Sequence, residues 1–534
     1  MGSRFNALVM MLVVAGALLL ASCGGPSSPT TTDLSKEGPT TTKPYGSLTV
    51  VTLFGTSQLD PQASSSETFL ALGLPVFDTL LRYTDDDVAT AGIAERWEIS
   101  PDGLTQTFYI RREVKFHNGD DLTGADVKFS IDRAMLPESV ESDAPTWRST
   151  VASVDLKDEY TVLIRFKAPQ YDMMLSIDGG MTAVVPKKYI EDKGVEYFRK
   201  NPIGSGPYKF VSMQVNSRIE LEALESHWRA APKFKTIILL NVAEESTKVA
   251  MLKTGELDMA AVAPDSIAAL KAAGVRIVDF DRGTDYYAIP FYDVEHPEKY
   301  ALGDVKVRQA VQLAINAKEI GDKLLNGYGA PLALYGAMQT AYFWDKNILK
   351  ADPFDPEGAK KLLGEAGYPN GFDTRLWDVG GGDMLSTIDQ SLAGYWRKVG
   401  INVQIVPIDF ATFRLKYNPK HLPEIWNSIW PYRAINKRNF EGMRSAFHST
   451  QGVFKNHNYT KLNEMIEKVP TLRDSPEKTK LALDTVVLAK STFSVLPIVN
   501  VFQTVAVSPK IGVLTNRVHN IIRGNVYEGI NHPK

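Results

Sequence analysis

The sequence predicts an α/β protein with more than one hydrophobic core. The chain has 534 residues, which exceeds the size at which a single core stops growing. Two segments, residues 235–261 and 372–405, each have the pattern strand, helix, strand. That pattern is typical of a parallel sheet with a crossover helix. A hydrophobic fraction of 44% is that of a soluble globular protein.

The charge balance and the cysteine count exclude several function classes. Lys and Arg number 59 against 62 Asp and Glu, which gives a formal net charge of −3. Because there is no basic excess to neutralise phosphates, we expect no nucleic-acid partner. Cys23 is the only cysteine, so an internal disulfide and a CxxC metal site are both excluded.

Residues 1–22 have the features of a secretory signal peptide. Arg4 supplies a positive charge, and the apolar stretch Ala7–Leu20 is too short for a comfortable membrane-spanning helix. The stretch ends in Leu-Ala-Ser-Cys, which resembles a bacterial lipobox. This resemblance implies cleavage before Cys23 and lipidation of that cysteine; the alternative is an incidental or buried cysteine. Several acyl chains on one residue would anchor the protein stably.

The residues after the cysteine have the composition of a linker. Residues 24–45 are rich in Gly, Pro, Ser and Thr and cannot bury much apolar surface. We therefore expect residues 23–46 to be a lipidated cysteine followed by a disordered tether.

Residues 95–134 carry the densest local signals. Ser-Pro-Asp-Gly at residues 100–103 predicts a turn, because Pro fixes φ and Gly allows a positive φ. The alternation after this turn places Leu104, Phe108 and Ile110 on one face of a half-buried strand. By themselves these signals fit any α/β protein.

Helix boundaries can be predicted from capping residues. Thr123 and Asp126 stand at capping-box spacing. Ser246 is expected to cap a helix that Gly255 ends. Residues 201–210 contain Gly-Ser-Gly, which invites a nucleophile or phosphate-loop interpretation. No Lys-Ser/Thr follows and the G-x-S-x-G spacing is absent, so we favour a rigid turn.

The second half of the chain repeats the α/β pattern. Asp304 and Pro356 each mark the start of a helix, and residues 372–378 predict a strand. Three glycines at 380–382 follow that strand. Ligands of open α/β sheets bind beyond the carboxyl ends of strands, so Trp377 and the glycines are cleft candidates. The alternative is a flexible loop next to a core tryptophan.

Four stretches carry a family resemblance. Residues 97–127, 201–210, 244–258 and 304–329 resemble the signature of bacterial extracellular solute-binding proteins of family 5, the oligopeptide, dipeptide and nickel receptors of ABC importers. The resemblance implies a two-lobed, periplasmic-binding-protein-like α/β fold of type II. It also implies the large class, with an extra subdomain in lobe 1 and a cleft that closes on a hinge.

The resemblance also implies domain boundaries. We expect lobe 1 at 47–285 with an inserted subdomain at about 68–195, lobe 2 at 286–492, and a return to lobe 1 at 493–534.

The resemblance directs attention to two stretches for ligand binding. The loop with Phe54 and Thr56 is expected to face the cleft. Peptide-binding relatives place an acidic residue in lobe 2 to pair with the peptide amino group, but the corresponding stretch, residues 426–436, has no Asp or Glu. Arginine suits a carboxylate or phosphate, and Trp and Tyr stack on rings. This stretch offers Asn427, Trp430, Tyr432 and Arg433 as ligand-binding candidates.

Other interpretations of these residues remain. Arg433 is also explained as solvated surface charge, and the tryptophans of the stretch as core residues. Asp281, Arg282 and Asp285, near the inferred hinge, are further candidates.

The expected function is that of a non-enzymatic, lipid-anchored, monomeric receptor outside the cytoplasm, in the periplasm or on the outer face of the membrane. It would capture a small solute, most commonly a peptide in this family, and deliver it to an ABC permease. The alternatives are a non-peptide solute (an oligosaccharide, an opine-like acid or chelated nickel), a solute sensor, or an extracytoplasmic hydrolase. The eight histidines include no pair three to five residues apart, so we expect no local metal site. We predict no catalytic residues and no cofactor.

Overall fold

The computed structural model describes the chain from residue 43 onward with gaps. The described ranges are 43–52, 58–64, 68–69, 72–83, 89–141, 143–172, 179–229, 232–279, 285–290, 294, 298, 300–335, 341–378, 383–408, 425–426, 440–450, 457–502 and 504–512. Among these residues, no helix is both long and apolar enough to cross a membrane.

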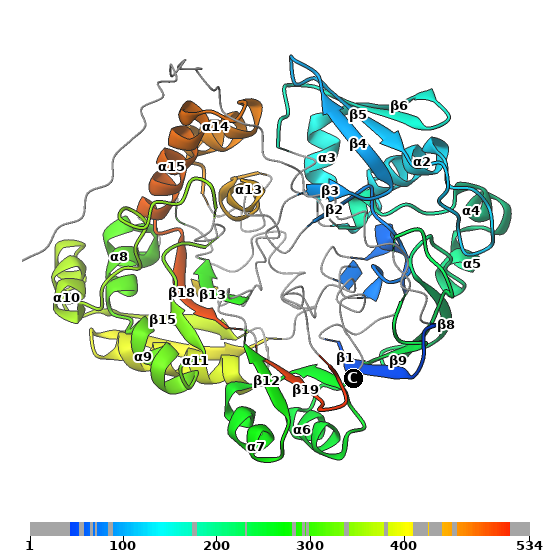
Figure 1. The fold of residues 1–534 in the computed structure, drawn as a ribbon. Helices are drawn as coiled ribbons and strands as arrows, with labels where there is room; N and C mark the ends of the chain where they lie inside the picture. Colours follow the sequence, from blue (N-terminus) through cyan, green and yellow to red (C-terminus); the bar gives the residue numbers. More distant parts are fainter. Residues whose placement is uncertain are drawn as a thin grey trace, which may run out of the picture. The chain divides into compact units, whose positions relative to one another are not determined.

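A seven-stranded mixed sheet joins the two ends of the described chain (Figure 1). Its order is β12-β19-β11-β1-β10-β9-β8. β1 pairs in parallel with both β10 and β11, whereas β19 pairs antiparallel with β11 and β12. The strands are β1 (Ser47–Val51), β8 (Tyr208–Gln214), β9 (Arg218–Ala223), β10 (Thr236–Leu240), β11 (Met259–Ala261), β12 (Arg276–Asp279) and β19 (Thr504–Val507).

The predicted strand-helix-strand unit lies in this sheet as β10, α6 (Glu245–Thr254) and β11. Gly255 ends α6 with φ +74°, as predicted. The cap at Ser246 is wrong, because the helix begins at Glu245 with Glu244 as its N-cap residue. The Glu245 carboxylate instead accepts hydrogen bonds from the backbone N of Ala263 and the hydroxyl of Ser266, which ties the helix start to the residues after β11.

Each face of the seven-stranded sheet has its own buried cluster. One contains Leu48, Val50 and Phe77, and the other contains Val51 and Leu257. The alternation of Val50 and Val51 between the two clusters is what a strand covered on both faces requires. Helices α4 (Lys187–Lys193) and α5 (Val195–Lys200) contribute to the first cluster, and α7 (Ile267–Ala272) contributes to the second. The short elements of this part of the chain are η2 (Pro61–Ala63), β2 (Leu81–Tyr83), β3 (Ala89–Ala91), η4 (Gly180–Thr182) and η5 (Pro264–Ser266).

A separate four-stranded antiparallel sheet has the order β4-β5-β7-β6 and packs against α2. Thr123 and Asp126 form the predicted capping box at the start of α2. Phe108 and Ile110 are buried as predicted, but Leu104 is 37% exposed. The buried face uses Gln106 instead, whose amide donates to the backbone O of Gln170. The elements are β4 (Ala94–Ile99), β5 (Thr105–Ile110), α2 (Gly124–Ala134), α3 (Ala144–Thr150), β6 (Val151–Asp158) and β7 (Thr161–Phe166).

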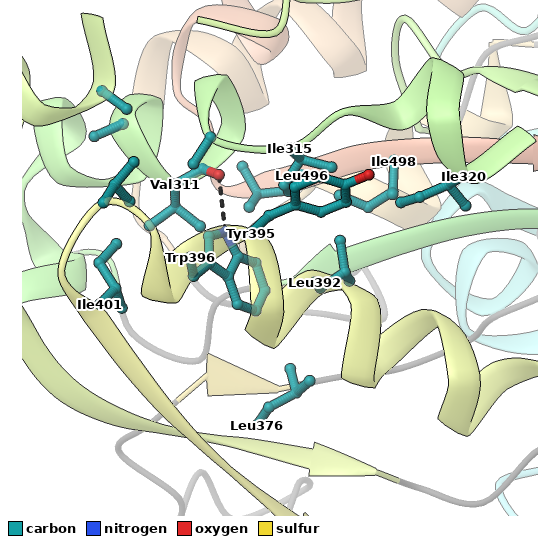
Figure 2. Packing of buried hydrophobic residues seen from close by; sticks show 14 of the residues in the cluster. Val311, Ile315, Ile320, Leu376, Leu392, Tyr395, Trp396, Ile401, Leu496 and Ile498 are labelled. Carbon is teal, nitrogen blue, oxygen red and sulfur yellow. Dashed lines mark hydrogen bonds between the residues drawn. The ribbon is translucent and has the colours of Figure 1, made fainter. Parts of the chain in front are cut away.

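The second predicted strand-helix-strand unit is present in a parallel sheet with the order β16-β15-β17. Helix α11 connects β15 to β16, and its Trp396 is fully buried. The indole N–H of Trp396 donates to the backbone O of Val311 at 2.9 Å, among the apolar side chains that Figure 2 shows. The elements of this region are α8 (Val305–Leu313), η6 (Ala301–Gly303), α9 (Ala317–Glu319), η7 (Ile320–Leu324), α10 (Pro356–Glu365), β15 (Phe372–Asp378), α11 (Asp383–Arg397), β16 (Ile401–Pro407) and β17 (Ile425–Trp426).

A three-stranded sheet with the order β13-β18-β14 lies next to this unit, since β13 contacts β17. Leu496 and Ile498 of β18 pack in the same buried cluster as Trp396. The strands are β13 (Asp285–Pro290), β14 (Gly329–Pro331) and β18 (Val495–Val501).

The remaining helices enclose another buried cluster, which includes Leu462 and Val486. Arg308 of α8 connects the end of α15 to α8 and to the residues just before it. It is 1% exposed, and its guanidinium donates to the backbone O of Thr492 and to the carbonyls of Leu302 and Gly303. The helices are α13 (Glu441–Phe447), α14 (Thr460–Lys468), η8 (Val469–Thr471) and α15 (Pro476–Ser491).

Candidate functional site

The carboxyl end of β15 brings two of the predicted ligand-binding stretches together. Trp377 is the second-last residue of β15 and is half-buried. In the parallel ladder it lies opposite Val406 of β16 and Trp426 of β17. Trp426 immediately precedes Asn427, so the backbone leads from beside Trp377 directly into the candidate stretch. This is the location that crevice binding at an open α/β sheet predicts.

The next residue anchors the end of the strand. The Asp378 carboxylate accepts a hydrogen bond from the Ser386 hydroxyl at 2.7 Å, and the Asp378 carbonyl accepts from the backbone N of Ile408 at 2.8 Å. These bonds tie the carboxyl end of β15 to α11 and to the residue after β16. They position Trp377 by fixing the backbone on which it stands. No sequence pattern marks Asp378, because its side-chain partner Ser386 is eight residues away in the next element.

Asn500 is a polar residue near this sheet that no sequence pattern marks as a candidate. Asn500 lies on β18, opposite Ala330 of β14 and Tyr286 of β13. Its side-chain oxygen is buried, and no residue that the structure describes hydrogen-bonds to it. A buried oxygen without a partner is uncommon, which makes Asn500 an additional candidate on the sheet that adjoins β17.

Trp377 is therefore the candidate that can be placed. Phe54, Thr56, Asn427, Trp430, Tyr432, Arg433 and Cys23 lie outside the described residues, as do Asp281 and Arg282; Asp285 begins β13, but only its backbone is described.

The Gly-Ser-Gly stretch is a structural turn. Ser205 is 1% exposed, and its hydroxyl donates to Asp78 at 3.1 Å. A Cβ on Gly204 would lie 2.1 Å from the backbone O of Val76, so this turn packs too closely to admit a substrate. His227 is adjacent, but its Nε2 lies 2.8 Å from the carbonyl oxygen of Ser205 and not from the hydroxyl. A nucleophilic triad needs the histidine on the hydroxyl, so this Ser-His-Asp grouping does not have catalytic geometry.

Asp78 is the centre of this buried network. Besides Ser205, its carboxylate accepts from the indole of Trp228 at 2.9 Å and from two guanidinium nitrogens of Arg229 at 3.0 and 2.6 Å. Burial by itself raises the pKa of Asp78, but the Arg229 charge and the His227 hydrogen bond outweigh it and hold the pKa well below its usual value. Asp78 thus remains ionised and joins its own segment to residues that lie 127 to 151 positions later in the sequence.

His117 connects two of the stretches that carry the family resemblance. Its Nε2 lies 2.9 Å from the carbonyl of Gly206, and its Nδ1 accepts from the backbone N of Gly204. This pairing requires the neutral tautomer with the proton on Nε2. Burial is the main cause that lowers the pKa of His117 to about 4. His117 therefore has a structural role in this turn. Among the described residues, no group of three His, Cys, Asp or Glu side chains could hold a metal ion.

The arrangement of helices and sheets matches known solute receptors. The oligopeptide-binding protein AppA from Bacillus subtilis, solved with a nonapeptide, is 20% identical, with a TM-score of 0.77 over 92% of this chain and 100% of that one. AgaA from A. tumefaciens R10, solved with agropinic acid, is 22% identical, with a TM-score of 0.77 over 92% and 99%. The chain therefore has the two-lobed type II α/β fold of periplasmic binding proteins, as predicted.

The sequence comparison gives the family. The model for bacterial extracellular solute-binding proteins, family 5, matches residues 89–450, and the chain belongs to this family. The glutathione-binding protein GsiB of Salmonella choleraesuis (strain SC-B67) is 28% identical over 356 residues, which span 66% of this chain and 67% of that protein. Members of this family are binding proteins, in agreement with the prediction of a solute-binding function.

Proposed function

We propose that the chain is the substrate-binding component of an ABC importer. It captures a small solute between its two lobes and delivers it to a permease in the membrane. Support comes from family membership and from relatives whose names describe binding of glutathione or of peptides. The observation that carries the proposal is the pairing of Trp377 with Trp426, which joins the carboxyl end of β15 to the predicted ligand-binding stretch at the place where α/β sheets bind ligands.

The first ligand class we propose is peptide. The binding residues we propose are Trp377 together with the undescribed candidates Phe54, Thr56, Asn427, Trp430, Tyr432 and Arg433. One observation favours a second class, a non-peptide organic acid. Residues 426–436 contain Arg433 but no Asp or Glu, so they offer a cation for a carboxylate and no carboxylate to pair with an amino group. A structural relative solved with agropinic acid has the same fold.

The organisation that serves this function has lobe 1 at 47–285 with an inserted subdomain at about 68–195, lobe 2 at 286–492, and a return at 493–534. The pairing of β19 with β11 and β12 supports the return. Because β18 belongs to a different sheet and packs against Trp396, we propose that residues 493–501 are part of lobe 2 and that the return enters lobe 1 near Phe502, later than the expected start at 493. We also propose that residues 1–22 are removed and that lipid on Cys23 holds a monomeric receptor outside the cytoplasm.

Mass spectrometry of the small molecule that co-purifies with the full chain tests the ligand. Recovery of peptides, or of an organic acid, from denatured protein supports binding and decides between the two classes. The site is tested with Trp377→Ala in a titration of the recovered molecule, against Tyr368→Ala, a half-buried aromatic residue of the same lobe. We expect Trp377→Ala to weaken binding at least about tenfold, since a buried aromatic anchor contributes about 2 kcal/mol or more. Equal affinity in the two variants would remove Trp377 from the site.

A further inference from the structure

Two segments about 300 residues apart in the sequence meet at a polar contact. One consists of the turn at residues 100–103 and the segment 170–172, beside the four-stranded sheet. The other is residues 470–478, at the start of α15. The backbone N of Tyr171 donates to the carbonyl of Pro470 at 3.1 Å, and Lys478 Nζ donates to Asp172 Oδ1 at 2.5 Å. We call these segments together the distal contact.

The cation in the distal contact is buried. Lys478 is 1% exposed and Asp172 is 8% exposed. Lys478 also reaches the exposed Asp474 at 3.1 Å. An unpaired ammonium at this depth would be costly, so the pair with Asp172 is what permits its burial.

The position of Lys478 in its helix points to the same partner. Ser475 caps α15 by accepting from the backbone N of Lys478, which makes Lys478 the third residue of the helix. The amino end of a helix has a partial positive charge, so a lysine there is unfavourable. The helix thus gives no reason for a buried cation at this place, whereas the carboxylate of Asp172 does.

The segment that carries Asp172 is preformed on its own sheet. The carbonyl of Gly103 accepts from the backbone N of Gln170 at 2.9 Å, and the carbonyl of Pro101 accepts from the Tyr171 hydroxyl at 3.1 Å. Gly103 has φ +72°, and a Cβ there would lie 2.7 Å from the Tyr171 ring. The Ser-Pro-Asp-Gly turn therefore holds Tyr171 in place and presents Asp172 to its partner.

Arg473 completes the distal contact from the other side. Its guanidinium lies 5.4 Å from the centre of the Tyr171 ring, donates to the Tyr171 hydroxyl at 3.3 Å, and donates to the carbonyl of Pro101. Arg473 and Pro101 are both exposed. All of these groups can exchange their partners for water, as a surface that separates requires.

The two sides of the distal contact have separate apolar cores. The four-stranded sheet and the helices α13–α15 belong to different buried clusters, so no shared apolar core joins the two sides among the residues that the structure describes. Such small, polar interfaces are typical of domains that move relative to one another.

We propose that the distal contact is a latch, which forms when the two lobes close and stabilises the closed form without touching the ligand. This inference rests on the proposed function only in that the lobes open and close. A latch raises the population of the closed form, and the apparent ligand affinity changes by the same factor as that population. The affinity of this receptor is then set partly by residues that lie outside the ligand site.

A distance measurement without ligand tests the latch. Cys23→Ser removes the only cysteine of the full chain, and spin labels are attached at Glu95→Cys and Glu464→Cys, both exposed positions on either side of the contact. In the parent we expect two populations of the distance between the two labels, a short one from the closed form and a longer one from the open form. With Lys478→Met we expect the short population to fall at least about tenfold relative to the long one, because the closed form would lose the buried ion pair between Lys478 and Asp172.

The design includes matched variants. Lys480→Met removes an exposed lysine of the same helix and should leave the distances unchanged. Asp172→Asn, nearly isosteric, should deplete the short population too, and the double variant Asp172→Asn/Lys478→Met should lose less than the sum of the two single changes. If Lys478→Met does not fold, Asp172→Asn decides.

Two results would overturn the latch. One is a parent that never populates the short distance. The other is a pair of folded variants, Lys478→Met and Asp172→Asn, with the same distances as Lys480→Met. Neither result depends on a ligand, so a failure of the latch is distinct from a failure of the proposed function, which would appear as no recovered solute.

Discussion

Replacing Arg308 by Met should loosen the carboxyl end of α15. The guanidinium of Arg308 donates two hydrogen bonds to the carbonyl of Thr492, at 3.1 and 2.9 Å, where α15 ends. It also donates to the carbonyls of Leu302 and Gly303 at 2.9 and 2.8 Å, and to the hydroxyl of Tyr459 at 3.3 Å. One side chain thus serves four acceptors from three separate parts of the chain.

The magnitude follows from what the methionine would leave behind. Each buried acceptor that loses its donor costs about 1–3 kcal/mol. Removal of a buried cation offsets part of this, because burial disfavours the charged guanidinium and lowers the pKa of Arg308. A net loss of about 3 kcal/mol in local stability corresponds to roughly 100-fold faster opening-limited exchange. The local stability of Arg308→Lys should lie between that of the parent and that of Arg308→Met, since an ammonium is a point donor that cannot span all of the carbonyls.

Hydrogen exchange followed by mass spectrometry is the suitable assay, because a chain with several cores need not unfold in one step. Peptides that cover residues 485–496 should lose protection in Arg308→Met. Lys306→Met is the matched control, as Lys306 lies on the same helix, is 48% exposed and pairs with Glu365 at the surface, a contact worth about 0–1 kcal/mol. Exchange of these peptides within about twofold in the two variants would refute the role assigned to Arg308.

Three further outcomes follow from contacts in the first half of the chain. Gly103→Ala should destabilise the fold more than Gly119→Ala, by about 1 kcal/mol or more in urea unfolding. Both glycines have positive φ, but a Cβ at Gly119 meets nothing within 4 Å, whereas one at Gly103 meets the ring of Tyr171; equal losses would contradict this contact. The pKa of His117 is lowered to about 4 from 6.5, so the unfolded chain binds more protons between these values and stability must fall as pH drops through this window, by about 2 kcal/mol between pH 7 and 5. His117→Gln should lose most of this pH dependence, which is measured from unfolding curves at the two pH values. If the variant shows the same change in unfolding free energy between the two pH values as the parent, the pH dependence does not come from His117. The lowered pKa of Asp78 means that its ionised form stabilises the fold above pH 4, and this stabilisation is lost as the pH falls below 4. Asp78→Asn should therefore be less stable at neutral pH and show a shallower acid transition by circular dichroism. An acid transition as steep as that of the parent would contradict this role of Asp78.

Local sequence signals predicted the local structure well. The capping box of Thr123 and Asp126 and the cap at Asp304 were found at the predicted residues, because each depends on groups within three positions. The errors occurred where contacts with residues far away in the sequence determine which side chains are buried. Leu104 follows the strand alternation and is still exposed, while Gln106 takes a buried place because the carbonyl of Gln170 is there to accept its amide hydrogen.

The site could be predicted only in part for the same reason. Trp377 was identified because the end of a strand followed by glycines is a local pattern. That it would lie opposite Trp426 depends on strand register between segments about 50 residues apart, which single-sequence patterns do not contain. The pair Asp172 and Lys478 is more distant still, and neither residue has a neighbour in sequence that marks it.

The position of β19 has a consequence for how the chain folds. β12 is an edge strand of the seven-stranded sheet. Among the strands that the structure describes, it pairs with β19 alone, through contacts such as Arg276 with Val507. During synthesis β12 therefore emerges more than 200 residues before its partner exists, and β11 keeps an unpaired edge for the same interval. Long-range pairing of this kind makes folding slow and leaves a strand edge open to wrong partners. Completion of the first sheet is thus one of the last steps, and a chain cut short before Thr504 would lack the strand that joins β12 to β11.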